Sequence, residues 1–580
     1  MRNILMCGIF SLLNNDDTFS SDFILKQFNK GHKRGPEFSS LQKEICDFIL
    51  GFHRLAINGC DDISHQPIIL NNDYYLICNG EIYNYKELYE KMGITPTTNS
   101  DCEVILHLYI HYGIEQTLRM LDGVFAFILV DLNVHNDKPI IHVARDPLGV
   151  RPLYKLYKEC SGKSLYGFAS DAKSLIEFKK SKNDRNEQNK YFLQHFEPGT
   201  YQTFIYSAKI LRRWVFKSQK RYFNFNFSSL CNVNHYTEKM IYQNIIFYLK
   251  NAVYKRCSNT ERPVACLLSG GLDSSLICSL VCEYNKQHNK PPPETYSIGI
   301  TGSQDLHYAK IVADFLHTKH TEIKISESDF VNEIPNVIKT VESYDTTTIR
   351  ASIGNYLLGK YISLNSDAKV ILNGDGADEL CGGYLYMFHA PDDIEYDNEC
   401  VRLLEEIHMF DVLRSDKCIS SHGLEPRTPF LDRSWVQFYM SIPINIRNHN
   451  NGKHMEKYLL RNAFSEEHYG SQLLPTEILF RSKEAFSDGV SKQNRSLFEI
   501  IQSSPEVKSF DYVQQNPLLK SLQEYHNPDT KEKQYYVHLF NTHLPDCGSL
   551  INRYWMPRFI EAVDASARTL DTYKKNNNNV

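Results

Sequence analysis

One stretch near the middle of the chain, VACLLSGGLDSSLICSLVCEY at residues 264–284, limits the fold more than any other. Its first five residues are apolar, as in a short buried strand, and residues 276–284 are apolar enough for a helix. Between them, Gly270 and Gly271 let the backbone turn sharply, so that successive N–H groups can converge on an anion. A strand, a glycine-rich turn and a helix predict a phosphate-binding loop in a parallel α/β sheet.

This loop carries a carboxylate that phosphate would repel. It lacks the lysine of a P-loop and the spacing of a dinucleotide-binding turn, but it contains Asp273 among the hydroxyl donors Ser269, Ser274 and Ser275. A cation between Asp273 and phosphate would remove the repulsion. We therefore predict Mg²⁺, held by Asp273 and phosphate oxygens.

A second acidic loop follows another short apolar strand. VILNGDGADELCGGY at residues 370–384 carries Asp375, Asp378 and Glu379. Carboxylates this close repel one another unless a metal ion, lysine or arginine neutralises them, or unless the loop is merely solvated at the surface. In a doubly wound sheet both loops would lie at the carboxyl edge, where ligands bind.

The pattern changes along the chain. Short β-like runs dominate the first part, and helices alternate with short strands from about residue 235, which indicates parallel βαβ units. The predicted domains are residues 7–215, a linker at 216–234, a second domain at 235–570 and a disordered tail at 571–580. The polar run KKSKNDRNEQNK at 179–190 is expected to be an exposed loop.

Composition narrows the class of protein. A net charge of −5 gives no basic field for nucleic acid, and no apolar run reaches the roughly 20 residues that span a bilayer. The apolar start of the chain resembles a short signal peptide, but no cleavage site follows it. The 15 cysteines include no CxxC pair, which favours free thiols in a reducing compartment and therefore the cytosol.

SGGLDSS followed by a GDGADE loop resembles the ATP pyrophosphatase domain of asparagine synthetases. Further segments match that family in order and spacing: ETYSIGITGSQDL, SYDTTTIRAS, HMFDVLRSDK, LEPRTPFLD, FRSKEAFSDGVS, YWMPRF and DASARTL. The resemblance implies that the β-carboxylate of aspartate attacks ATP, that pyrophosphate leaves and that ammonia attacks the aspartyl-adenylate.

The resemblance also implies the residues of this site. Asp273 and Asp378 would hold Mg²⁺, and Lys483 and Asp375 would act in catalysis. ATP and diphosphate would be bound by Leu268, Ser269, Gly270, Gly271, Asp273, Ser274, Ile298, Arg350, Asn373 and Gly374.

The chain departs from the family pattern in two places. Asp375 stands where the family usually has glutamate, and one methylene less shortens the reach of the carboxylate; a misplacement of about 1 Å can slow a reaction on the order of 100-fold. Residues 352–356 read SIGNY, where the family tends to read STPMY.

The first part of the chain resembles class II glutamine amidotransferases. GFHRLAING, CNGEIYNYKEL, TNSDCEVIL, LDGVFAFILVD and ARDPLGVRPLY carry this resemblance, which implies an αββα sandwich of the N-terminal nucleophile hydrolase type. Cys7 would attack the glutamine amide, and Asn79 and Gly80 would bind the oxyanion. Glutamine would be bound by Arg54, Leu55, Ala56, Ile57, Asn58, Asn79, Gly80, Glu81 and Asp101.

In this class the base is the α-amine of the cysteine itself, so the cysteine must be the first residue. Here MRNILM precedes Cys7, and its nitrogen is an amide while those residues remain. Losing a general base typically slows a reaction by about 10²–10⁴-fold. We expect translation to start at Met6, so that removal of this methionine exposes Cys7; cleavage of residues 1–6 or an inactive glutaminase are the alternatives.

The predicted enzyme is a glutamine-hydrolysing asparagine synthetase. An ammonia-dependent synthetase, a β-lactam synthetase relative and a non-enzymatic relative are the alternatives. The predicted ligands are ATP, Mg²⁺, aspartate and glutamine or ammonia. Homodimerisation and a tunnel for ammonia are expectations of the family resemblance alone.

Overall fold

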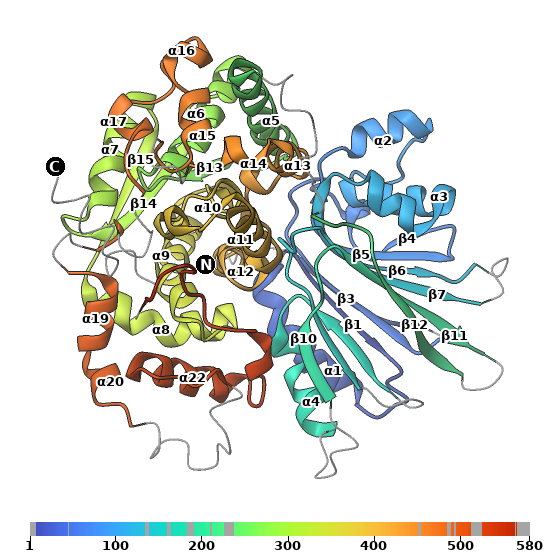
Figure 1. Ribbon diagram of the computed structural model, residues 1–580. Coiled ribbons are helices and arrows are strands. Elements are labelled where there is room, and N and C mark those ends of the chain that lie inside the picture. Colours follow the sequence, from blue (N-terminus) through green and yellow to red (C-terminus); the bar gives the residue numbers. More distant parts are fainter. Residues whose placement is uncertain are drawn as a thin grey trace. The chain divides into compact units, whose positions relative to one another are not determined.

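The structure is a computed structural model that describes residues 7–44, 46–133, 138–158, 164–182, 191–208, 212–225, 237–449, 454–483, 489–491, 495–511, 525–562 and 564. The chain divides into two units (Figure 1). Unit 1 runs to Asn224 and also contains Ser420–Leu424 and His543–Leu550. Unit 2 contains Phe225–Ile419, Glu425–Thr542 and the chain from Ile551 onward.

Unit 1 contains two antiparallel six-stranded sheets. The first has the order β10 (Tyr191–His195), β8 (Tyr154–Lys158), β9 (Tyr166–Ala169), β1 (Gly8–Leu13), β3 (Phe48–Arg54) and β2 (Phe38–Glu44). The second has the order β12 (Arg213–Arg221), β11 (Thr200–Ser207), β7 (Ile140–Arg145), β6 (Gly123–Asp131), β5 (Tyr74–Ile82) and β4 (Ile68–Leu70).

The side chains of β6 show why these sheets form layers. Phe125, Phe127 and Leu129 pack in a core with α2 (Tyr85–Met92) and α3 (Val104–Met120). The alternate residues of β6 point the other way, because side-chain directions alternate along a strand, and pack in a second core with residues of β1 and β3.

Helices also cover the other face of the first sheet. Phe10 of β1 contacts Phe28 of α1 (Ser21–Phe28) and Phe178 of α4 (Ile176–Lys182), with ring centroids 5.9 and 6.2 Å apart. The predicted αββα sandwich is therefore confirmed.

Two predicted loops are partly wrong. Residues 216–221, assigned to the linker, belong to β12, because they continue its ladder with β11 up to the pair Thr200–Arg221. The helix α4 includes residues 179–182 of the polar run. Residues 183–190, 226–234 and the predicted tail at 571–580 lie outside the described residues.

Unit 2 is built on a parallel sheet, as predicted. Its order is β15 (Lys319–Ile325), β14 (Glu294–Ile300), β13 (Val264–Leu267), β16 (Val370–Leu372) and β17 (Glu425–Arg427), and every adjacent pair is parallel. The chain first runs outward from β13 through β14 to β15, and then crosses back to β16 and β17. Ligands bind in such sheets at the carboxyl ends of the strands where this direction reverses, here between β13 and β16.

The helices of unit 2 connect and surround these strands. The longer ones are α5 (Glu238–Ser258), α6 (Leu272–Gln287), α7 (Gln304–Leu316), α8 (Glu327–Val341), α9 (Thr346–Asn365), α11 (Asp393–Glu406), α12 (Asp411–Ser420), α13 (Arg433–Ser441) and α22 (Lys531–His543). The short ones are α10 (Ala377–Cys381), α14 (Ile444–Arg447), α15 (Tyr458–Ala463), α16 (Glu466–Tyr469), α17 (Thr476–Leu479), α19 (Leu497–Ser503) and α20 (Pro505–Lys508).

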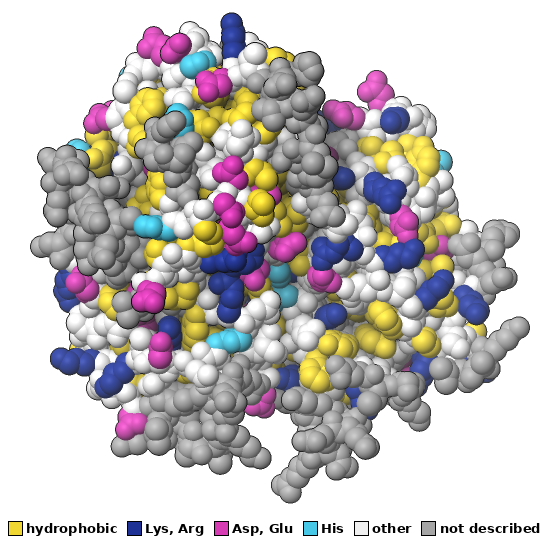
Figure 2. Space-filling model, viewed as in Figure 1, with side chains coloured by type: hydrophobic (Ala, Val, Ile, Leu, Met, Phe, Trp, Pro, Cys, Tyr) yellow, Lys and Arg dark blue, Asp and Glu magenta, His cyan; other side chains and the backbone are white. Residues whose placement is uncertain are grey.

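The surface carries charges of both signs. On the face drawn in Figure 2, basic and acidic side chains of the described residues are interspersed. Among the helices in the described ranges, none combines the length and the apolar character that a membrane span requires.

Candidate active sites

A cavity lies at the carboxyl edge of the parallel sheet, and we call it the sheet-edge cavity. The loop after β13 and the loop after β16 both line it, so the prediction that they meet at one edge is confirmed. The predicted ATP, metal and catalytic residues that line it are Leu268, Ser269, Gly271, Asp273, Ser274, Ile298, Asn373, Gly374, Asp375, Asp378 and Lys483.

Local geometry explains why these loops are rich in glycine. Gly270 has φ of 72°, a left-handed conformation that residues with a Cβ rarely adopt. At Gly374 a Cβ would lie 2.8 Å from the backbone nitrogen of Ser274, so the absence of a side chain lets the two loops touch. Ser269 and Ser274 lie with their hydroxyl oxygens 3.0 Å apart, at the start of α6. Hydroxyl groups and the helix N-terminus therefore face one part of the cavity.

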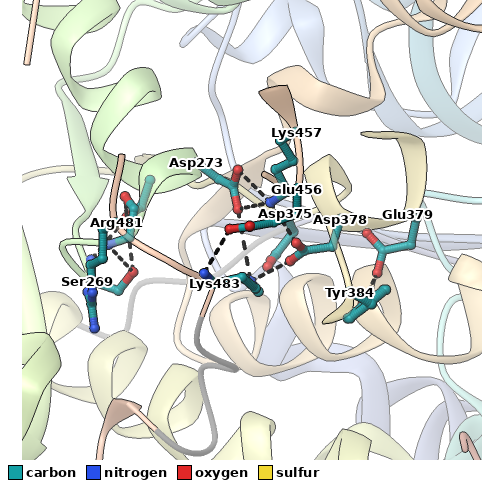
Figure 3. A network of polar contacts seen from close by, with 12 residues as sticks. Ser269, Asp273, Asp375, Asp378, Glu379, Tyr384, Glu456, Lys457, Arg481 and Lys483 are labelled. Atoms are coloured by element: carbon teal, nitrogen blue, oxygen red, sulfur yellow. Dashed lines mark hydrogen bonds and ion pairs between the residues drawn. The ribbon is translucent and has the colours of Figure 1, made fainter. Parts of the chain in front are cut away.

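The two predicted metal ligands share a buried lysine that the sequence analysis missed (Figure 3). The Lys457 Nζ lies 2.8 and 2.6 Å from the two carboxylate oxygens of Asp273, and 2.6 Å from Oδ1 of Asp378. Its side chain is 2% exposed. Gly383 makes room for it, because a Cβ there would lie 2.8 Å from the Lys457 Nζ.

Lys483 approaches the same carboxylates from a different segment. Its Nζ lies 2.5 Å from Oδ2 of Asp378 and 4.0 Å from Oδ2 of Asp273. Its backbone N–H donates to Oε1 of Glu456 at 2.8 Å, which fixes the start of the side chain. Lys483 is less buried than Lys457, with 21% of its side chain exposed, and it faces the cavity.

These ion pairs set the charge of the site. Burial alone would raise the pKa of Asp378, but Lys457 and Lys483 hold the pKa of this carboxyl below its ordinary value. Burial would lower the pKa of Lys457, but Asp273 and Asp378 raise it. Asp378 and Lys457 are therefore both ionised at neutral pH.

A third cation, Arg481, lies at the glycine-rich loop. Its guanidinium donates to the carbonyl oxygen of Gly270 at 3.1 Å, lies 3.5 Å from Asp305 and stacks 4.0 Å from the ring centroid of Tyr308. Because it also lines the cavity, it can contribute positive charge where a polyphosphate would lie.

The carboxylate of Asp375 has two hydrogen-bond partners. It accepts from Asn373 Nδ2 at 2.9 Å and from Arg414 Nη2 at 3.1 Å. Burial raises the pKa of Asp375, and Arg414 opposes this shift. Burial also raises the pKa of Glu379 well above its usual value, with Asp411 and Asp378 adding to the shift, and the hydroxyl of Tyr384 donates to Glu379 at 2.5 Å.

The structure does not place Arg350 at the sheet-edge cavity, contrary to the prediction. The side chain is 3% exposed, and its guanidinium binds Glu532 at 2.6 and 2.9 Å and Asp564 at 2.7 and 3.0 Å. Two carboxylates occupy the donors that a phosphate would need. The cations that line the cavity include Lys457, Arg481 and Lys483.

The carboxylates fit the predicted magnesium ion. No group of three or more His, Cys, Asp or Glu side chains within the described ranges is placed to hold a metal by itself. Magnesium ions at nucleotide sites are usually held by one or two carboxylates together with phosphate oxygens. Asp273 and Asp378 supply two such carboxylates, and Lys457 occupies the space between them.

In unit 1 the structure brings Cys7 to the segment that follows β3. The half-buried thiol donates to the carbonyl oxygen of Leu55 at 3.3 Å and accepts from its N–H at 3.4 Å. Ser170 links this region to the predicted oxyanion residue, because its hydroxyl oxygen accepts from the N–H of Ile9 at 3.0 Å and from Asn79 Nδ2 at 3.5 Å.

The predicted glutamine-binding residues lie at the ends of β3 and β5 and in the turn at Asp101–Glu103. Arg54 ends β3 and donates to the backbone carbonyls of Asp61, at 2.7 Å, and Gly59. Asn58 donates to Glu81 at 2.7 Å, and Asp101 accepts from the N–H of Ile82 at 2.6 Å. Leu55, Ala56 and Ile57 are buried beside Arg54, and Gly80 lies between Asn79 and Glu81 in β5.

An αββα unit with this cysteine and arginine set, followed by a parallel α/β unit with a phosphate-type loop, defines a class: a glutamine amidotransferase joined to an ATP-using synthetase. The family description "Asparagine synthase" matches residues 247–398 and 392–545, and "Glutamine amidotransferase domain" matches residues 6–220. The chain belongs to the asparagine synthase family.

Relatives match over nearly the whole length. The chain is 40% identical over 593 aligned positions to asparagine synthetase [glutamine-hydrolyzing] of Gallus gallus. It is 38% identical over 583 positions to the proteins of the same name from Homo sapiens and Mus musculus. Each of these alignments covers 98% of this chain and 99% of the relative.

Proposed function

We propose that the chain makes L-asparagine from L-aspartate, with ATP and with ammonia released from L-glutamine, and forms AMP, diphosphate and L-glutamate. The observation that carries this proposal is the presence, in one chain, of both residue sets. One is the cation and carboxylate group of the sheet-edge cavity, and the other is the Cys7, Arg54 and Asn79 group of unit 1.

The synthetase reaction must first activate a carboxylate, because its oxygen is a poor leaving group. The β-carboxylate of aspartate attacks the α-phosphorus of ATP, diphosphate departs and β-aspartyl-AMP forms. Ammonia then displaces AMP. We assign to Lys483 and Arg481, which line the cavity, the neutralisation of the departing diphosphate. We assign the binding of its oxygens to Ser269, Ser274 and the backbone of Gly271, which line the same cavity.

We assign Asp273 and Asp378 as the ligands of Mg²⁺. When bound with ATP, the ion would neutralise phosphate charge. Without the ion, Lys457 neutralises the two carboxylates and keeps them together in a buried place. Lys483 reaches Asp378 from the cavity side and remains available to a phosphate.

In the glutaminase reaction we assign Cys7 as the nucleophile. Asn79 and Gly80 bind the oxyanion, Arg54 binds the α-carboxylate of glutamine, and Glu81 and Asp101 accept from its α-ammonium. The α-amine of Cys7 is the base, so we infer that Cys7 becomes the first residue. Residues 1–6, including the proposed start at Met6, lie outside the described residues.

A product assay tests the proposal. Purified protein is supplied with aspartate, Mg·ATP and either glutamine or ammonium, and asparagine, AMP, diphosphate and glutamate are measured. Asparagine and AMP in equal amounts from both nitrogen sources, with glutamate from glutamine, are the expected result. Activity with ammonium alone would identify an ammonia-dependent synthetase, and AMP without asparagine would favour an acyl-adenylating relative such as a β-lactam synthetase.

We also propose that the enzyme acts in the cytosol as a homodimer. The cysteines are scattered singly along the sequence, and those in the described ranges form no disulfide, which supports a reducing compartment. Dimerisation rests on the family resemblance, and sedimentation of the purified chain tests it.

A further inference from the structure

One amide that faces the sheet-edge cavity, in a residue that is largely buried, has no partner among the described residues. Asn355 lies in α9, in the SIGNY segment, at the position where the family tends to have methionine. Its side chain lines the cavity and the residue is 6% exposed. Its side-chain amide makes no hydrogen bond with any residue in the described parts of the chain, and it opens to the cavity.

An amide buried in this way is unfavourable unless something else supplies a donor and an acceptor. A methionine at the same place would have no such requirement. The sheet-edge cavity is where we place the nucleotide, so the partner of Asn355 can come from a ligand instead of from the protein.

The residues around Asn355 indicate which part of a nucleotide would contact its amide. Ala351 and Leu358 lie four residues before it and three after it, on the same face of α9, and both line the cavity. The same helix packs against β14, whose Ile298 also lines the cavity. These three neighbours are apolar, and the same two elements add the hydroxyl groups of Ser297, Thr347 and Thr348 to the lining. The charged groups Asp273, Asp378 and Lys483 come from other segments.

An apolar slot with one amide at its side suits a purine base. The ring faces need apolar contact, and the ring edge needs hydrogen bonds. A carboxamide matches the adenine edge, because its oxygen accepts from the 6-amino group and its nitrogen donates to an adjacent ring nitrogen. A guanine or hypoxanthine base carries a carbonyl oxygen at position 6 and lacks that donor.

We propose that Asn355 binds the edge of the adenine base of ATP and favours it over bases without a 6-amino group. This inference rests on the proposed function, because it takes the sheet-edge cavity as the ATP site. It also gives the SIGNY departure a physical meaning: this chain replaces an apolar contact to the base by hydrogen bonds.

The test is a cycle of two proteins and two ligands. Dissociation constants are measured for the full chain and for Asn355→Met, with Mg·ATP and with the Mg complex of purine riboside triphosphate, which lacks the 6-amino group. The unaltered chain should bind ATP about tenfold more tightly than the analogue, since one or two net hydrogen bonds are at stake. In Asn355→Met, ATP should bind about tenfold more weakly and the preference should vanish.

Leu358→Met is the matched control, because it changes the same helix face without touching an amide. It should alter the binding of both nucleotides by the same factor and leave their ratio unchanged. Thermal unfolding of Asn355→Met should occur at the same temperature or higher, because the substitution removes a buried unpaired amide.

Other outcomes would overturn the proposal. If Asn355→Met keeps the preference for ATP, the amide does not contact the base. If its nucleotide affinities are unchanged but less asparagine forms per glutamate released, Asn355 acts on the passage of ammonia. If the unaltered chain binds ATP without preference, only this inference fails; if it binds neither nucleotide, the proposed function fails as well.

Discussion

In the sheet-edge cavity charged side chains pair with one another, whereas in unit 1 the predicted glutamine-binding residue Arg54 donates to backbone carbonyls. Lys457 lies between Asp273 and Asp378. Arg54, by contrast, donates to two backbone carbonyls, and Asp101 accepts from a backbone N–H.

The difference matches the ligands that we propose. Two buried carboxylates that wait for a metal repel each other, so the protein supplies its own cation in the meantime. An arginine that is to bind the α-carboxylate of an amino acid needs a charge that no carboxylate of the protein neutralises. A carbonyl or an amide can hold such a side chain in position without neutralising it.

The largest expected effect comes from removing one of the two proposed metal ligands. Asp273→Asn should abolish ATP-to-AMP turnover with glutamine and with ammonium, because the carboxylate pair is lost. Release of AMP and diphosphate measures it. Glutamate formation from glutamine is the control and should continue. Near-normal AMP release would contradict our metal assignment.

The next effect concerns the N-terminus of unit 1. A chain that begins at Cys7 should hydrolyse glutamine about 10²–10⁴-fold faster than one that retains residues 1–6, because only a free α-amine can act as the base. Intact mass defines each preparation, and glutamate release gives the rate. Ammonium-dependent synthesis should be the same in both. Equal glutaminase rates would show that Cys7 uses another base.

Lys457→Met tests how much the ion pairs of Lys457 with Asp273 and Asp378 stabilise unit 2. Two buried carboxylates would lose their shared cation, so the free energy of unfolding of unit 2 should fall by about 3–5 kcal/mol. Urea denaturation followed by fluorescence measures it, since Trp435 and Trp555 lie in unit 2 and Trp214 in unit 1.

Two comparisons sharpen this prediction. Added Mg²⁺ should stabilise Lys457→Met more than the unaltered protein, because the ion can take the place of the ammonium group. Lys319→Met is the matched control: this lysine is 78% exposed and pairs with Glu294, so its loss should change stability by less than about 1 kcal/mol. No response of Lys457→Met to Mg²⁺ would contradict the assignment.

The smallest expected effect is a pH dependence of unit 1. Burial lowers the pKa of His53 from 6.5 to about 4, and its ring lies between the hydroxyl of Ser39, at 2.8 Å, and the carbonyl of Phe28, at 3.0 Å. The unfolded chain binds the proton more readily, so stability is complete above about pH 6.5 and falls as the pH drops toward 4.

The shift of the pKa sets how much the free energy of unfolding falls, which is up to about 3 kcal/mol at low pH. His53→Gln should flatten this part of the pH profile of the unfolding of unit 1, which is followed by the fluorescence of Trp214. His142 of β7, whose pKa burial also lowers to about 4, gives an independent second position. An unchanged profile in both variants would show that folding does not lower the pKa of these rings.

Local patterns predicted much of this molecule. The glycine-rich turns after β13 and β16 could be placed because strand, turn and helix signals are local and because the carboxyl ends of parallel strands share one edge. The end of β12 could not be predicted, because KSQKRY has no apolar alternation. Only its pairing with β11 makes it a strand.

The misplaced and missed cations have a common cause. Arg350 lies in a recognisable segment, SYDTTTIRAS, but its partners Glu532 and Asp564 lie far along the chain. No local sequence pattern predicts such long-range pairs. Lys457 stands in a stretch without a motif and acquires its role only through contact with two distant loops. Residues that act through long-range pairing are therefore the ones that local sequence patterns do not predict.

Unit 1 is assembled from three pieces of the chain, since Ser420–Leu424 and His543–Leu550 belong to it. The ammonium group of Lys179, in α4, contacts the carbonyl of Asp546 and lies 3.4 Å from the sulfur of Cys547. The first 224 residues are therefore not a separable module. A gene fragment that stops near residue 224 would encode unit 1 without two of its three pieces and would expose the surface that these pieces cover. Fusing such a fragment to another enzyme would require redesign of that surface.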